Sequence, residues 1–332
     1  MEYPHAGPLM FHQRCSTVEE IHVGSWDFSY EQISKGAFSA DVTGLPVGGS
    51  SFLVLEVGSQ SVYTSGTLSD NKFGLTAFLD SNGGGVVCGK PLEADGVALI
   101  RGGSSYEIYT NGPLNMFTVT FDLNDSRFDF LSDLMFDCRR GSEGTKALCS
   151  ASGLYSKLFH FSGMYCRALD AVEKSGARSS LWMADLNDFL IFELLAELEL
   201  ALGASLKDGR VRSTAWMLKD VRELLLSSEY EDLSLVDICD KLRISPRTLR
   251  KNVFQNLGMG PLLFSRYVRL NAVRCDFVQY CKRGLDFRIS DIAEKRGFWH
   301  LARFSGYYKN LFGELPSDTV KVLRSGRVTE GG

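Results

Sequence analysis

Three basic side chains recur at helical spacing in the stretch ISPRTLRKNV, residues 244–253. Arg247, Arg250 and Lys251 occupy positions i, i+3 and i+4, so a helix would present all three on one face. Leu249 and Val253 would point the other way, into a core. An arginine can donate two hydrogen bonds to O6 and N7 of a guanine. The pattern favours recognition of bases in a DNA groove; the alternative is a basic face in contact with water.

A second stretch, GFWHLARFSGYYKNLFG, residues 297–313, combines an aromatic side with a polar side. Its apolar residues recur three or four positions apart, which is the spacing of the buried face of a helix: Phe298, Leu301, Phe304, Tyr308 and Phe312. The other side must face water or a polar partner, for which nucleic acid is the sharper candidate.

Other kinds of chemistry find little support. The segment GGVVCGK, residues 84–90, approaches a phosphate-binding P-loop but has Pro91 where a magnesium-binding Ser or Thr belongs, so a Gly-rich β-turn is the better interpretation. The five histidines show no HxH or HExxH spacing, and no GxSxG elbow occurs. We therefore expect no metal, no cofactor and no enzymatic activity. A β-barrel enzyme fused to a DNA-localising region is the alternative from another class.

The two basic helices need a scaffold, and the C-terminal segment supplies one that repeats. In LSLVDICDKLRISPRTLRKNV, Ser234 is a candidate cap for a first helix, while Ser245 and Pro246 suit the cap and first position of a second. In RISDIAEKRGFWHLARFSGYYKNLF, Ser290 is a candidate cap and Gly297 separates two helices. Two short helices joined by a tight turn, twice over, predict a tandem helix-turn-helix arrangement.

A longer helix is predicted between the two pairs, beginning at Pro261. Its apolar residues form a single stripe: Leu263, Tyr267, Leu270, Val273 and Phe277. About 20 helical residues span roughly 30 Å, close to the ~34 Å between successive major-groove faces on one side of B-DNA. A rigid helix of this length would hold two reading heads one turn of DNA apart.

Five motifs of the C-terminal segment fall in the order and spacing of one known family: ISPRTLRK, LGMGP, RYVRLNAVR, DIAEKRGFWHLARF and YYKNLFGELPSD. Through them, residues from about 213 to 325 resemble the DNA-binding domain of the AraC/XylS family of bacterial transcription regulators. The pairing of RLNAVR with GFWHLARF is most similar to regulators of the ethanolamine-operon type. The β-rich first part is compatible with the family's effector-binding and dimerising domain.

The resemblance implies roles for individual residues. Bases would be read by Arg247, Arg250 and Lys251 on the first reading helix and by Leu301, Ala302, Ser305 and Gly306 on the second. Phosphate contacts, which position a protein without specifying sequence, would come from Thr248, His300, Arg303 and Lys309. The reading face of the second helix is small and apolar, so it should select sequence more weakly, through a thymine methyl group or close backbone approach.

Two residues depart from the family's pattern. Val253 stands where Phe is usual, with Phe254 beside it as a candidate replacement, and Gly306 stands where a longer polar side chain is common. For His300, a structural role competes with phosphate contact. Trp299 is expected to pack in the protein rather than to intercalate.

The first part of the chain has the alternation of β-strands. WDFSYEQI and NMFTVTFD alternate apolar and polar residues, which predicts half-buried strands. We predict an α+β multidomain fold: residues 1–202 form a jelly-roll-like sensing domain, β-rich to about residue 123 and helical over 125–202; residues 203–213 form a linker; and residues 214–325 form an all-α tandem helix-turn-helix domain. The segment 186–202 is apolar on more than one face, so it is either a dimerisation helix or buried within its domain.

Charge is distributed unevenly along the 332 residues. From Gly209 onward there are 22 Lys and Arg against 14 Asp and Glu, whereas the preceding residues hold 14 against 26. The basic end is therefore expected to meet a polyanion. No secretory signal pattern and no run of about 18 apolar residues occurs, and the eight cysteines form no CxxC pair. These features predict a cytoplasmic protein with no membrane contact.

Two sites for an effector are open. The apolar interior of the β-rich domain could enclose a small molecule. Alternatively, Lys207, Arg210 and Arg212 could clamp an anionic nucleotide at the domain junction, although solubilising linker charges or nonspecific DNA contacts are the simpler explanation.

We expect a homodimeric transcription regulator, an activator, that binds double-stranded DNA, contacts RNA polymerase and answers to a small-molecule effector. A ligand-independent regulator controlled by protein contacts is the alternative.

Overall fold

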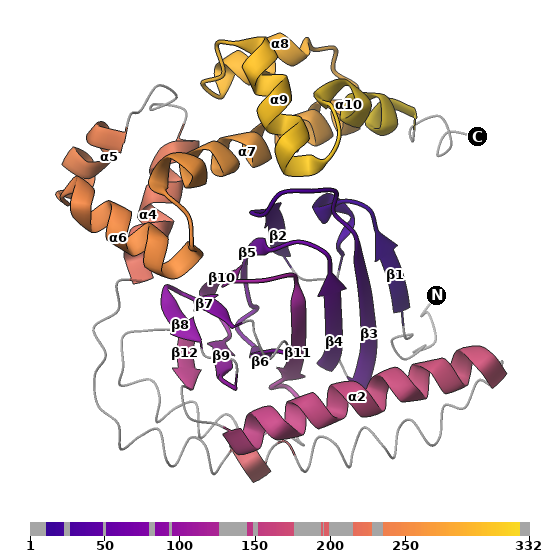
Figure 1. Cartoon of the computed structure of the whole chain (residues 1–332). Helices are drawn as coiled ribbons and strands as arrows, with labels where there is room; N and C mark the ends of the chain where they lie inside the picture. Colours follow the sequence, from indigo (N-terminus) through magenta and orange to yellow (C-terminus); the bar gives the residue numbers. More distant parts are fainter. Residues whose placement is uncertain are drawn as a thin grey trace.

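The computed structural model describes residues 11–22, 27–48, 51–79, 84–92, 95–125, 145–148, 152–175, 194, 196–198, 215–227 and 235–325. A β-rich N-terminal part is followed by a helical C-terminal part, which confirms the predicted fold class (Figure 1).

The β-rich part consists of two antiparallel sheets. The larger has the strand order β1-β3-β4-β11-β6-β9-β12, and the smaller has the order β2-β5-β10-β7-β8. The bounds are β1 Phe11–Cys15, β2 Asp27–Gln32, β3 Ala40–Gly48, β4 Ser51–Gly58, β5 Val62–Thr67, β6 Lys72–Phe78, β7 Gly85–Val87, β8 Lys90–Leu92, β9 Val97–Arg101, β10 Ser105–Thr110, β11 Asn115–Asp122 and β12 Thr145–Leu148. A 3₁₀ helix, η1 (Val18–Glu20), follows β1.

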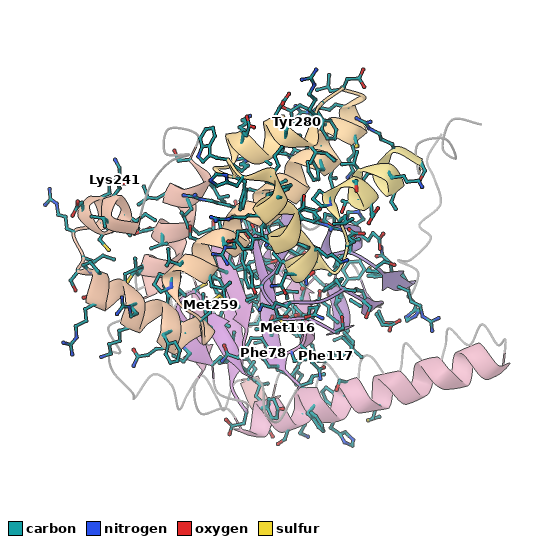
Figure 2. The ribbon with its side chains drawn as sticks, turned by 45° about the horizontal axis from the view of Figure 1, so that its top comes forward. Phe78, Met116, Phe117, Lys241, Met259 and Tyr280 are labelled. Atoms are coloured by element: carbon teal, nitrogen blue, oxygen red, sulfur yellow. The ribbon has the colours of Figure 1, made fainter. Side chains whose placement is uncertain are left out.

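Apolar side chains fill both faces of the larger sheet. On the inner face, Val54 and Met116 belong to a core shared with Ile108 of the smaller sheet. On the outer face, Phe117 of β11 packs with Leu158 of helix α2 (Ser152–Ser175). Met116 and Phe117 are consecutive, so they point to opposite faces of β11 (Figure 2).

Two expectations for this part are corrected. Strand β11 is buried on both faces rather than half-buried, because its threonines, including Thr120, also lie inside the protein. The segment 125–202 is not helical throughout, since β12 extends the larger sheet by pairing with β9. Within 186–202, Leu194 and Leu198 are buried in the same core as α2, which favours burial within the domain over dimerisation for these two side chains.

The Gly-rich segment 84–90 forms a turn, as predicted. Strands β7 and β8 pair as a hairpin, and the two residues between them, Cys88 and Gly89, have φ angles of 45° and 67°. Two positive φ angles in a two-residue hairpin loop are typical of a type I′ turn. No helix follows this loop within residues 84–92, so the segment lacks the form of a P-loop.

The C-terminal part contains seven described helices. They are α4 Ala215–Leu226, α5 Leu235–Leu242, α6 Pro246–Leu257, α7 Pro261–Arg283, α8 Ile289–Lys295, α9 Leu301–Phe312 and α10 Pro316–Ser325. Helices α4, α5 and α6 gather near one end of α7, while α8, α9 and α10 gather near the other (Figure 1). Met259, in the connection between α6 and α7, packs against the cores of both groups (Figure 2).

Most of the predicted helix boundaries are confirmed. Pro246 and Pro261 stand in the first turns of α6 and α7, and Gly297 has a φ of 82° between α8 and α9. Ser290 is not a cap: α8 begins at Ile289, and the Ser290 hydroxyl donates to the Asp291 carboxylate at 3.0 Å. Ser234 lies outside the described residues.

The buried surface of α7 is also wider than the predicted single apolar stripe. Besides that stripe, Asn271 and Arg274 are buried at 5 % exposure each, because α7 lies against the β-rich part as well as against its own helical neighbours. Within the described ranges, no helix has the length and apolar content needed to cross a membrane.

Candidate DNA-binding surface

Helix α6 presents its basic residues to solvent. Arg247, Thr248, Arg250 and Lys251 are all exposed. Leu249 and Val253 are 1 % and 0 % exposed, in a core with Ile238 of α5 and Phe264 of α7. The predicted division of this helix into a basic face and a core face is therefore confirmed. Phe254 is 62 % exposed, so it does not replace the usual Phe in the core; Val253 alone fills that place.

The start of α6 is fixed by its cap. Ser245 accepts a hydrogen bond from the Thr248 amide at 3.1 Å, and the two hydroxyl oxygens lie 2.8 Å apart. Pro246 occupies the first turn, where its missing N–H costs nothing. The Thr248 amide thus helps to order the first turn of α6, while the side chains of that turn, Arg247 and Thr248, stay exposed.

The turn before α6 contains a basic residue, Arg243, that was not predicted from the sequence as part of this surface. Arg243 is exposed and has a φ of 52°, a left-handed conformation in which Gly is favoured. In the second pair of helices the corresponding turn uses Gly297, with a φ of 82°. The internal repeat was the signal that could have identified this turn, and Arg243 adds one more exposed cation just before α6.

Helix α9 has the aromatic core face that its sequence predicts, with one exception. Phe304, Tyr308, Leu311 and Phe312 are buried, but Leu301 is 41 % exposed. Leu301 is the first residue of the helix, so its side chain lies beyond the core, among the proposed base-reading positions. Trp299 is 62 % exposed, which contradicts the expectation that it packs in the core.

The predicted reading positions of α9 lie at its surface: Ala302 and Gly306 are exposed, and Ser305 is half-buried. The predicted phosphate contacts Arg303 and Lys309 are also exposed. A Cβ added to Gly306 would meet no heavy atom within 4 Å, so packing does not require Gly there. His300 is exposed and immediately precedes the helix, without a side-chain capping bond.

Two contacts fix the second pair of helices on α7. The Arg296 guanidinium, at the end of α8, makes a bidentate pair with Asp276 of α7, with nitrogen–oxygen distances of 2.7 and 2.9 Å. The Arg266 guanidinium lies 4.0 Å from the ring centre of Tyr307 on α9. Because α7 has 23 residues, it is about 35 Å long, and both reading helices are attached to this one rod.

The β-rich part contacts both groups of helices through the end of β2. Gln32 exchanges two hydrogen bonds between its backbone and the Asn271 side chain of α7, at 3.0 and 2.8 Å. The Gln32 side chain and the Gly36 amide both donate to the Leu311 carbonyl at the end of α9. On the other face of β2, Glu31 accepts from Arg222 of α4.

A second ion-paired contact lies farther along α7. The Arg274 guanidinium bonds Glu19 of η1 at 2.9 Å and Glu314, just after α9, at 2.8 Å. It also lies 4.8 Å from the ring centre of Phe312. Arg274 therefore joins the β-rich part, α7 and the second pair of helices at one point.

The β-rich part encloses a space between its two sheets. Its lining is apolar and aromatic apart from a few hydroxyl groups and one carboxyl group, that of Glu56. Glu56 is 3 % exposed and accepts a hydrogen bond from the Tyr30 hydroxyl. Burial raises the pKa of Glu56 to about 7, although the Tyr30 hydrogen bond acts in the opposite direction. The signal for this residue was a single acid in the apolar run SFLVLEV, which sequence reasoning overlooked.

The other predicted effector residues, Lys207, Arg210 and Arg212, lie outside the described residues, as does the predicted linker. Among the described residues, no cluster of three or more His, Cys, Asp or Glu side chains could hold a metal ion.

Comparisons with known proteins match the C-terminal part of the chain. Residues 238–321 match the family model described as a helix-turn-helix domain. The XylDLEGF operon transcriptional activator 2 of Pseudomonas putida is 32% identical over 91 residues, covering 27% of this chain and 56% of that protein. The HTH-type transcriptional activator RhaR of Yersinia pseudotuberculosis is 26% identical over 157 residues, covering 45% of this chain and 50% of that protein.

Similar solved structures extend over more of the chain. The AraC-like transcriptional activator CuxR covers 73% of this chain and 85% of its own, with a TM-score of 0.37 and 14% identity. The match to ToxT of Vibrio cholerae covers 91% of this chain and 99% of ToxT, with a TM-score of 0.31 and 13% identity. The chain spans about half the length of the two curated relatives named above. Within residues 238–321, the chain carries a helix-turn-helix domain of AraC type.

Proposed function

We propose that this chain is a sequence-specific DNA-binding transcription regulator that acts as an activator. The observation that carries the proposal is α6: a capped helix within a helix-turn-helix match, with Leu249 in the core and three cations exposed on the other side. Arg247, Arg250 and Lys251 read bases, and Thr248 contacts phosphate. On α9, the bases meet Leu301, Ala302, Ser305 and Gly306, and the phosphates meet His300, Arg303 and Lys309.

The organisation that we propose is the one expected from the sequence. Residues 1–202 form the sensing and dimerising domain, 203–213 the linker and 214–325 the DNA-binding domain, in a cytoplasmic homodimer that contacts RNA polymerase. A small-molecule effector binds the N-terminal domain. Support for effector control comes from the contacts of β2, since Gln32 bonds α7 and α9 while the adjacent Glu31 bonds α4 of the first group. A shift of this strand would alter the balance between two arrangements of the readers.

The base-reading role is tested by Arg250→Ala. This variant should lose about 1 to 3 kcal/mol of affinity for the preferred site and become less selective at one base pair. Arg283→Ala is the matched control. Arg283 is an exposed arginine at the end of α7, away from α6, and its substitution removes the same charge.

Fluorescence anisotropy on a site selected from random DNA, and on all single-base variants of it, gives both quantities. Equal losses on every sequence for Arg250→Ala would contradict base reading. Affinity for all sites should also fall steeply with salt concentration, since binding to several phosphates releases counterions.

A further inference from the structure

The space between the sheets has a composition that restricts what it could hold. It is lined from the smaller sheet by Phe28, Tyr30 and Tyr106, and from the larger sheet by Val54, Ile100 and Met116, with Glu56 among them. Its described lining contains no Lys, Arg or His. A carboxylate ligand would therefore meet an acid and no cation, which excludes the usual means of holding an anion.

Glu56 is the one acidic group of this lining, and it has acceptor capacity for a ligand. An ionised carboxylate offers about four acceptor positions, and the Tyr30 hydroxyl fills one of them. A buried carboxylate is costly unless it is paired. A positively charged ligand group would provide that pairing within the same space.

The aromatic residues suit the same charge. Phe28 and Tyr30 meet edge to face with ring centres 5.3 Å apart, and Tyr106 lines the same space. Aromatic faces attract cations, and ammonium groups in particular are held by aromatic rings. The available space is small, with room for roughly two water molecules, so a ligand of few atoms is required.

We propose that the space between the sheets binds a small alkylamine in its ammonium form, with its nitrogen paired to the Glu56 carboxylate and its alkyl part against Val54, Ile100 and Met116. This inference deepens the proposed effector control, and it depends on that proposal only for its regulatory meaning. Tyr30, which lines the space, immediately precedes Glu31 and Gln32 on β2, and these two residues contact the helical part.

Three probes of matched size separate the possibilities: methylamine, methanol and formate. Calorimetry on the full chain at pH 8 should show that methylamine binds at least ten-fold more tightly than methanol, with no binding of formate. Glu56→Gln should reduce the affinity for methylamine at least ten-fold. Glu107→Gln is the matched control, because Glu107 is another buried acid of the β-rich part, bonded to Tyr63 and outside this lining.

A second measurement needs no variant. The affinity of the unmodified chain for methylamine should rise roughly ten-fold from pH 6 to pH 8, as Glu56 ionises around pH 7, while alkylamines stay protonated, like lysine, below about pH 10. The titratable groups near Glu56 are Tyr30, Tyr106 and Cys15. Burial raises the pKa values of Tyr30 and Cys15, the latter to about 11, so neither should change charge in this range.

Several results would overturn the inference: no binding of methylamine, equal binding of methanol, preference for formate, a flat pH response, or full affinity in Glu56→Gln. None of these readouts involves DNA. A chain that binds methylamine as described but shows no selectivity among DNA sequences would refute the proposed function and leave this site standing.

Discussion

At the scale of single residues, Gly306 separates helix stability from DNA contact. It lies on the exposed side of α9 with open space around it. Gly306→Ala should therefore stabilise the chain by about 0.5 to 1 kcal/mol. If α9 approaches the groove through its backbone, the added methyl group should also weaken DNA binding.

The matched control for Gly306 is Gly163→Ala in α2. An added Cβ at Gly163 likewise meets nothing within 4 Å, and α2 packs on the sheets rather than within the helical part. Urea unfolding should show a gain for both variants, whereas anisotropy should show weaker DNA binding for Gly306→Ala alone. Undiminished DNA affinity in Gly306→Ala would remove the close backbone approach from the account.

Glu56 should make stability depend on pH. Its pKa of about 7 lies above the ordinary glutamate value of 4.5 because of burial. The folded chain thus holds this proton more tightly than the unfolded chain, and the associated stability, present at low pH, is lost as pH rises through about 7. Glu56→Gln cannot ionise, so relative to the unmodified chain it should gain roughly 2 to 3 kcal/mol between pH 5 and pH 8.

Urea unfolding of Glu56→Gln and the unmodified chain at both pH values measures that gain. An unchanged difference in unfolding free energy would show that Glu56 titrates normally and is not confined in an apolar space.

At the scale of elements, β2 is one of the strands that join the two parts of the chain. Asn271 holds the backbone of Gln32 with two buried hydrogen bonds. Asn271→Ala would leave both backbone groups without these partners, at a cost of about 1 to 3 kcal/mol each when buried. We expect lower stability and faster hydrogen exchange at the Gln32 amide.

Asn256→Ala provides the comparison for Asn271→Ala. Asn256 is also a buried asparagine, but its side chain bonds Asn252 within the same helix, α6. It should destabilise the chain without changing exchange at Gln32. Slow exchange of the Gln32 amide in Asn271→Ala would mean that Asn271 is not what holds the end of β2 against α7.

The elements also show how far the sequence alone could lead. Helices α6, α7 and α9 could be predicted because their periodicity, prolines and glycines are local signals, and the same is true of the β7–β8 turn. Three features depend on contacts between distant residues and leave no such signal: the burial of Thr120, the pairing of β12 with β9, and the burial of Arg274 between Glu19 and Glu314. The exposed face of α6 was predicted residue by residue. The space between the sheets that Glu56 lines was missed, because it forms only when the two sheets meet.

At the scale of the whole molecule, tandem reading of DNA requires two reading helices attached to one rod. Helix α7 is about 35 Å long, from 23 residues, and successive major-groove faces are separated by ~34 Å. Two bonded contacts, Arg296 with Asp276 and Arg274 with Glu314, hold the second pair of helices on this rod. A rod of this length predicts a footprint with two parts.

The most direct test is a methylation-interference footprint of the purified chain on a DNA site selected for tight binding. Tandem reading predicts two clusters of major-groove contacts, centred about one helical turn or 10 base pairs apart, and loss of guanine contacts within one cluster in Arg250→Ala. One undivided cluster, or contacts spread evenly along the DNA and unaffected by Arg250→Ala, would contradict the tandem reading of DNA by α6 and α9.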